Sequence, residues 1–175
     1  ERGLDPDKRS QLGAHYTDRE KIMMIINPVI VEPLTAEWEK AKAEISGHME
    51  KAAAAKGGTR TRSINQAQAV LDAHLQRLAD YRVLDPACGS GNFLYLALLA
   101  LKDLEHRAQV EAEALGLPRG FPRIGPEVVK GIEINPFAAE LARVSVWIGE
   151  IQWMLKNGFA ASGSPILKPL ATIEC

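Results

Sequence analysis

The stretch that decides the fold reads Arg82-Val83-Leu84-Asp85-Pro86-Ala87-Cys88-Gly89-Ser90-Gly91-Asn92-Phe93. Its β-prone start ends in an aspartate, a glycine turn follows, and an apolar helical stretch continues from Phe93. Gly89 and Gly91 lack a Cβ, so the backbone there can adopt a positive φ and approach a ligand closely. The first turn of the helix directs free N–H groups toward the same ligand. This order predicts a ligand site at the carboxyl edge of a parallel sheet, with Asp85 as a hydrogen-bond acceptor.

A second strand-to-helix junction is predicted where residues 128–134 meet Asn135 and Pro136, a favourable N-cap and first helical residue. Glu133 ends this strand. A carboxylate at that position can accept hydrogen bonds from both ribose hydroxyls of an adenosyl group; the alternative is a solvated glutamate at a strand end. In dinucleotide-binding enzymes the acidic residue lies about 20 residues beyond the glycines. Glu133 lies much farther away, which argues against a nicotinamide cofactor.

Both junctions resemble motifs of the DNA adenine-N6 methyltransferases of restriction–modification systems. Leu12-Gly13-Ala14-His15-Tyr16-Thr17 is similar to that family's segment at the methionine end of the cofactor. The resemblance implies that S-adenosylmethionine binds, with Ile134 packed on the adenine face. The cofactor-binding residues it implies are His15, Tyr16, Thr17, Asp85, Pro86, Ala87, Cys88, Gly89, Gly91, Asn92, Phe93, Glu133 and Ile134.

The residues before the glycine turn also have simpler interpretations. Thr17 with Glu20 has the form of a capping box, so Thr17 is alternatively a helix cap. His15 is expected to position or pack rather than to act as a base or metal ligand. The order of the motifs fits the gamma arrangement of these methyltransferases, and the alpha arrangement stays open.

Adenine-N6 methylation further requires that the flipped base be stacked and its amine held. In the family an Asn-Pro-Pro-aromatic string does this, and the chain matches it only superficially, at Asn27-Pro28-Val29 and Asn135-Pro136-Phe137. We therefore predict no catalytic residue within the chain, and expect it to be the cofactor-binding part of a longer enzyme, inactive alone. The alternatives are a methyltransferase for RNA or protein, or a non-catalytic cofactor-binding or structural module.

Periodicity predicts helices over residues 19–27, 35–55, 64–81, 92–115 and 136–156, and a third strand from Leu170. Pro28 is expected to kink or restart the first helix. The prediction is an α/β fold: a truncated Rossmann-like S-adenosylmethionine-dependent methyltransferase, with an N-terminal helical segment (1–80) and a β-α-β-α-β core (81–175).

Two surface features carry further expectations. The apolar face predicted for the last helix includes Leu141, Val144, Ile148, Ile151 and Leu155. Lys56, Arg60 and Arg62 are expected in a loop around Gly57-Gly58, either solvated or, alternatively, in contact with phosphate.

Composition limits the class of protein. The chain has 175 residues and a net charge of −1, which excludes a polycation built to grip DNA with its whole surface. No apolar run is long enough for a bilayer, no signal peptide is visible, and there are only two cysteines, so we expect a cytoplasmic protein without disulfides or a membrane partner. The four histidines show no zinc spacing, and no metal is predicted.

The expected macromolecular partner is DNA, held through parts of the full-length protein outside this chain. Specificity or restriction subunits are the other expected partners. The fragment is also expected to self-associate, because an unpaired strand edge favours it.

Overall fold

The computed structural model describes residues 17–159 and 173–174. The chain divides into two compact units, each assembled from separated segments. Of the described residues, the first unit holds 17–27, 82–100, 125–159 and 173–174, and the second holds 28–81 and 101–124. Each unit therefore draws on both sides of the division at residue 80 that we predicted from the sequence.

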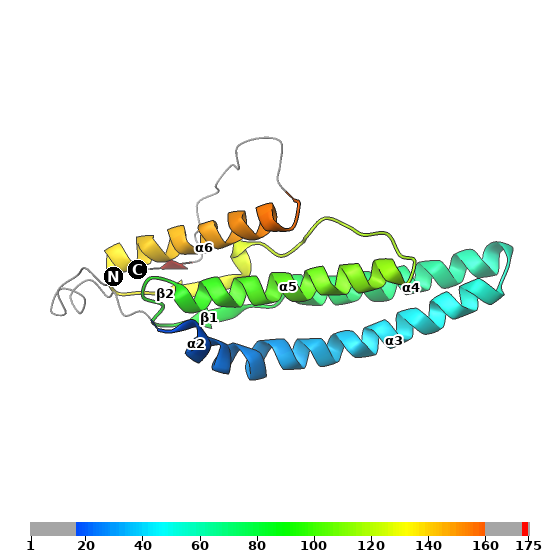
Figure 1. Ribbon diagram of the computed structural model, residues 1–175, viewed down its shortest axis with the longest axis horizontal. Helices are drawn as coiled ribbons and strands as arrows, with labels where there is room; N and C mark the ends of the chain where they lie inside the picture. The colour runs from blue at the N-terminus through cyan, green and yellow to red at the C-terminus, as the bar shows by residue number, and fades with distance from the viewer. Residues whose placement is uncertain (1–16, 160–172, 175) are drawn as a thin grey trace. The chain divides into compact units, whose positions relative to one another are not determined.

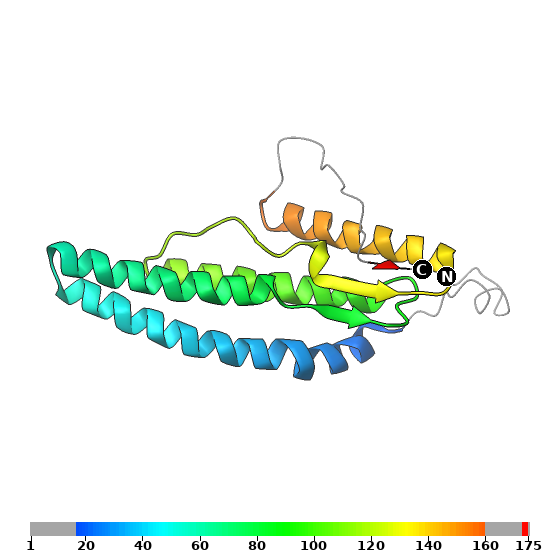
Figure 2. The ribbon, with the colours of Figure 1, turned by 180° about the vertical axis from the view of Figure 1, so that it is seen from behind.

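The first unit contains a small parallel sheet. Its elements are α2 (Arg19–Ile26), β1 (Val83–Asp85), the first part of α5 (Asn92–Ala114), η2 (Pro126–Val128), β2 (Val129–Ile132), α6 (Pro136–Lys156) and β3 (Ile173–Glu174). Among the described residues the strand order is β1-β2-β3, all parallel, with Val83 opposite Val129 and Gly131 opposite Ile173. Figure 2 shows β1 and β2 side by side. The structure thus confirms an α/β arrangement with strands joined by crossover helices.

The apolar face predicted for α6 is not the face that the helix buries. Leu141, Val144, Ile148 and Leu155 are exposed by 39%, 53%, 45% and 59%, and Ile151 is half-buried. The buried side carries mainly small residues, namely Ala138, Ala139, Ala142, Val146, Gly149 and Trp153. The helix lies so close to its neighbours that a Cβ on Gly149 would lie 2.8 Å from the Tyr95 ring. Bulky aliphatic residues do not fit such a contact, so they face outward.

The second unit is a helical hairpin with part of α5. Figure 1 shows α3 (Glu32–Ala54) beside α4 (Gly57–Ala79). Between α2 and α3 the chain forms a π-helical stretch, η1 (Asn27–Val31), which interrupts the regular α-helix around Pro28. The buried core of the unit comprises Trp38, Ile45, Ala67, Leu71, Leu75, Ala108, Ala112 and Leu117.

The start of α4 corrects the sequence prediction. The helix begins at Gly57 instead of Ile64, and Ser63, just before the predicted start, is already buried. Gly57, at φ +58°, reverses the chain between the two helices. Arg60 and Arg62 therefore lie in the first turns of a helix and not in a loop.

Three buried polar side chains of α5 fix the connection that follows it. Lys102 Nζ donates to the Ile124 carbonyl oxygen at 2.8 Å. Glu105 accepts from the N–H groups of Arg123 (2.6 Å) and Ile124 (3.1 Å), and Gln109 Oε1 accepts from the Gly120 N–H at 3.1 Å. Burial raises the pKa of the Glu105 carboxyl, while the two N–H donors act in the opposite direction. These bonds give order to residues 117–125, which belong to no helix or strand.

The described helices include none that is both long and apolar enough to cross a membrane.

Candidate ligand-binding site

A cavity of about 310 Å³ lies where β1 and β2 end, within the first unit. Its volume is at the lower end of the range for small-molecule sites, about 300–1,000 Å³. The carboxyl edge of a parallel sheet is the usual ligand position in α/β proteins. The cavity is lined by Thr17, Ile22, Asp85, Ala87, Cys88, Gly89, Ser90, Asn92, Phe93 and Glu133.

The lining brings together segments that are far apart in the sequence. Eight of the predicted residues border the cavity, whereas Pro86, Gly91 and Ile134 are not part of its lining. Sequence reasoning missed Ile22 and Ser90. Ile22 lies on α2 about one turn beyond Thr17 and is buried. Its place in the helical periodicity is the sequence signal that could have identified it. His15 and Tyr16 lie outside the described residues.

Thr17 does not cap α2, contrary to the capping-box alternative. The N-cap is Asp18, whose Oδ1 accepts from the Glu20 N–H at 3.4 Å. Thr17 instead borders the main cavity and a neighbouring one of about 160 Å³ on the side of Tyr95 and Leu99. Thr17, two residues before α2, thus forms one wall with the beginning of α5.

The glycine turn is held by main-chain bonds and by one carboxylate. The Gly89 N–H donates to Glu133 Oε2 at 2.8 Å, and the Cys88 N–H donates to the Ile132 carbonyl oxygen at 3.0 Å. The Ala87 N–H donates to Asp85 Oδ1 at 3.1 Å. These bonds therefore hold the turn to the end of β2 without the help of a ligand.

Glu133 uses both of its oxygens in this way, because Oε1 accepts from the Asn135 N–H at 2.9 Å. A carboxylate offers about four acceptor positions, so two remain for a ligand. The sequence indicated only that Glu133 can accept hydrogen bonds from a ligand. Nothing in the spacing of residues reveals that Glu133 also joins the glycine turn to the start of α6.

Gly91 has the positive φ that the sequence predicts, at +83°, which disfavours any other residue. The structure adds a packing reason that the sequence did not indicate. A Cβ built on Gly91 would lie 2.8 Å from Cα and 2.9 Å from Cβ of Ala142. Gly91 is thus required by the contact between the turn and α6. Gly89, at φ +53°, is the glycine that borders the cavity.

Cys88 is buried beneath the turn and faces a second glycine. A Cβ on Gly131 would lie 2.7 Å from the Cys88 Sγ. Burial, together with Asp85 and Glu133, raises the pKa of the Cys88 thiol to about 11. The thiol is therefore protonated at neutral pH and is a poor nucleophile.

Apolar surface adjoins the end of β2 beyond Glu133. Ile134 is 93% exposed and Phe137 is 57% exposed. Asn135 caps α6 as predicted, with Oδ1 accepting from the N–H groups of Phe137 (3.0 Å) and Ala138 (3.4 Å).

The site offers acceptors, a helix start and apolar surface, which suit binding of a polar ligand with a flat apolar ring. In the described part of the chain no group of three or more His, Cys, Asp or Glu side chains is placed to hold a metal ion.

Known proteins match this chain over most of its length. Residues 60–171, more than half of the chain, match the family model described as MmeI, DNA-methyltransferase domain. DNA methyltransferase A of Bacillus subtilis (strain 168) is 31% identical in an alignment of 172 positions that covers 95% of this chain and 16% of that protein. The solved structure of the type IIL restriction-modification enzyme MmeI in complex with DNA has 28% identity and a TM-score of 0.68, over 97% of this chain and 21% of that one. The chain thus spans about a fifth or less of the length of these relatives.

Proposed function

Because the chain belongs to the MmeI DNA-methyltransferase domain family, we propose that it is the S-adenosylmethionine-binding part of a DNA adenine-N6 methyltransferase of a restriction–modification system. The observation that carries the proposal is the cavity at the ends of β1 and β2, which brings Thr17, the glycine turn and Glu133 together. The parallel β1-β2-β3 order, with α5 and α6 as crossovers, supports a Rossmann-like methyltransferase core.

The residues at the end of β2 are proposed to hold the adenosyl group. The ribose hydroxyls donate to the two acceptor positions of Glu133 that its bonds to Gly89 and Asn135 leave available. Adenine covers Ile134, and removing apolar surface from water is favourable by about 25 cal/mol per Å². Asp85, at the end of β1, supplies a further acceptor on the same edge of the sheet.

The residues before α2 are proposed to hold the methionine end. Thr17 borders the cavity beside Asn92, the first residue of α5. A methionine carboxylate near this helix start is attracted by the exposed N–H groups of the first turn. Tyr16 and His15, next to Thr17 in the sequence, are proposed to contribute here. The remaining turn residues, Pro86, Ala87, Cys88, Gly91 and Phe93, shape this wall.

When bound, S-adenosylmethionine would supply an activated methyl group for transfer to an adenine amine, and the rate of such a transfer depends on alignment of the two reactants. The contribution of this chain is to bind and orient the cofactor. The base-binding Asn-Pro-Pro-aromatic string is not in its 175 residues. In the full-length protein, DNA is the proposed substrate and the cytoplasm the proposed location.

Calorimetric titration of the chain with S-adenosylmethionine tests the proposal, followed by incubation with tritiated cofactor and mixed-sequence DNA. We expect saturable binding and no transfer of label to DNA. Absence of binding at millimolar cofactor would refute the cofactor role. Label on DNA above background would show that the chain also holds the base-binding machinery.

A further inference from the structure

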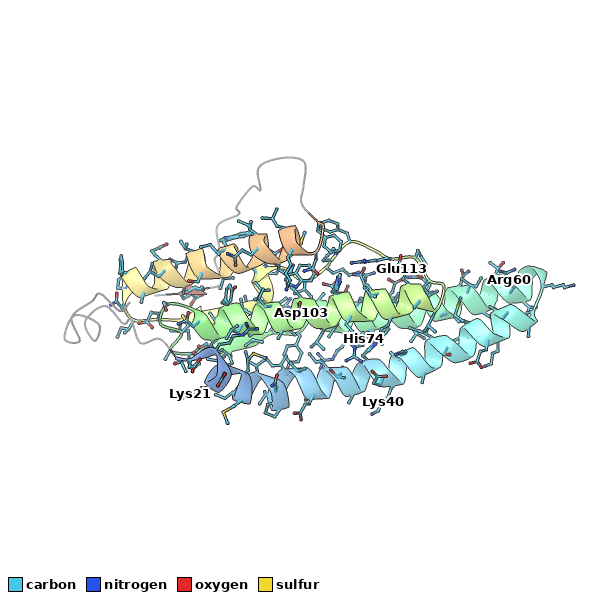
Figure 3. The ribbon with its side chains drawn as sticks, viewed as in Figure 1. Lys21, Lys40, Arg60, His74, Asp103 and Glu113 are labelled. Carbon is cyan, nitrogen blue, oxygen red and sulfur yellow. The ribbon has the colours of Figure 1, made fainter. Side chains whose placement is uncertain are left out.

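The end of the α3–α4 hairpin carries a positive charge that the chain as a whole lacks. From residue 51 to residue 71 the sequence has no Asp or Glu, although the net charge of the chain is −1. Four exposed cations lie in this stretch, and we refer to them as the hairpin tip: Lys51, Lys56, Arg60 and Arg62. Lys51 is in the last turn of α3, Lys56 precedes α4, and the arginines are in its first two turns. Figure 3 shows Arg60 at this end of the hairpin.

Several cations elsewhere in the second unit are paired with carboxylates. Arg107 lies 2.7 Å from Glu39, Lys42 lies 2.7 Å from Glu111, and Arg77 lies 3.4 Å from Glu37. Arg123 likewise pairs with Asp72. By contrast, no tip cation has a carboxylate within 4.0 Å among residues 17–159 and 173–174. The charge of the tip is therefore available to an external anion.

The side chains around the tip suit a polyanion more than a protein partner. Residues 52–55 are alanines, and a Cβ on Gly57 or Gly58 would meet nothing within 4 Å. No aromatic residue lies between Lys51 and Leu71, so the anchors that dominate protein–protein interfaces are missing apart from the arginines. Small residues let an extended anionic surface come close to cations placed on two helices.

We propose that the hairpin tip binds the sugar–phosphate backbone of duplex DNA, an inference that rests on the proposed function. Lysine and arginine contacts to phosphate supply affinity and position the protein without reading sequence. The hairpin thereby gives an otherwise acidic chain a local contact for the methylation substrate. This phosphate contact acts in addition to the part of the full-length protein that reads the recognition sequence.

The test compares two double variants of the chain that each remove two positive charges. Arg60→Gln with Arg62→Gln alters the tip, and Lys40→Gln with Lys156→Gln alters exposed lysines elsewhere. Glutamine is a good helix former, so circular dichroism should show unchanged helix content. Fluorescence anisotropy with two labelled duplexes of unrelated sequence gives the association constant between about 50 and 200 mM salt.

For the tip variant we expect the slope of log K against log salt to fall by about 2, since each lost phosphate contact removes about 1. At about 50 mM salt the affinity should fall tenfold or more, equally for both duplexes, while the matched control stays close to the unaltered chain. Equal slopes in tip and control variants, a loss confined to one duplex, or no duplex binding by the unaltered chain would each overturn the inference.

Titration with S-adenosylmethionine separates this inference from the proposed function. Both variants should bind the cofactor as the unaltered chain does. If the chain binds the cofactor but the tip and control variants bind DNA equally, only the DNA-binding role of the hairpin tip is refuted. If the unaltered chain does not bind the cofactor, the proposed function itself is refuted.

Discussion

Glu133 borders the ligand cavity and at the same time fastens the glycine turn. Its two oxygens accept from the N–H groups of Gly89 and Asn135, at 2.8 and 2.9 Å. Each hydrogen bond to a charged acceptor contributes about 1.5–3 kcal/mol. Substitution of this residue therefore changes both the turn and the affinity for a ligand, and the two effects must be measured separately.

We expect Glu133→Gln to weaken S-adenosylmethionine binding roughly ten- to a hundredfold, because a charged acceptor for the ribose is lost. Glu133→Ala should weaken it at least as much and also lower the melting temperature, since both main-chain bonds disappear. Titration calorimetry and thermal unfolding measure the two effects. Glu113→Ala, at an exposed position on α5, is the control. An unchanged dissociation constant in both Glu133 variants would rule out the ribose role.

Two glycines with opposite surroundings give a matched pair of stability predictions. Gly91→Ala places a Cβ 2.8 Å from the main chain of Ala142 at a φ of +83°, so we expect a loss of about 2 kcal/mol or more. Gly47→Ala, in the middle of α3 with nothing within 4 Å, should instead stabilise by about 0.5–1 kcal/mol. Urea unfolding of both variants checks the signs, and equal effects would contradict this account of the turn.

At the scale of elements, the sequence predicted what depends on local chemistry. The strand–turn–helix at Asp85, the cap at Asn135 and the helix stop at Gly116, with φ +94°, all need only neighbouring residues. It did not predict which face of α6 is buried, because hydropathy favours Leu141 and its neighbours over alanines. Small residues are required where α6 packs closely against Gly91 and Tyr95. This packing is part of the tertiary structure and cannot be read from the local sequence.

Glu111 joins α5 to α3 and sets a pH dependence for this packing. It accepts from Trp38 Nε1 at 2.9 Å and pairs with Lys42 and Arg107, each at 2.7 Å. The hydrogen bonds from Arg107, then those from Lys42 and Trp38, lower the pKa of Glu111 to about 2. A folded-state pKa below the unfolded value gives stability that is present above about pH 4.5 and is lost as pH falls toward 2.

Glu111→Gln should therefore lower the free energy of unfolding at pH 7 by about 1–2 kcal/mol, less than the full pKa displacement because water still reaches the side chain. The difference from the unaltered chain should shrink as pH falls from 4.5 to 2. Chemical denaturation at a series of pH values measures it. A difference that stays constant down to pH 2 would show that the ion pairs are not its source.

At the scale of the whole molecule, the chain forms two compact units that the sequence did not reveal. Each unit combines segments separated by many residues, and α5 contributes to both. Sequence patterns reflect residues that are close together along the chain. The domain division that we predicted at residue 80 therefore follows the order of the motifs. The proposed cofactor site lies entirely in the first unit.

Hydrogen exchange with and without S-adenosylmethionine tests this separation. A ligand stabilises the structure that binds it by mass action. We expect added protection in β1, the glycine turn and β2, and no added protection in the α3–α4 hairpin. Equal protection across both units would mean that they unfold as one, and unchanged protection throughout would contradict cofactor binding.

The interleaved segments also set the order in which the structure can form. The contacts between α3 and α4 join consecutive helices across a short reversal at Gly57, whereas Val83 finds Val129 only after all of α5 and the loop beyond it. Local contacts form quickly, and distant strand pairing is slow because the intervening chain must first be closed into a loop. During synthesis, the hairpin can therefore form before β2 has left the ribosome, when β1 does not yet have this strand to pair with.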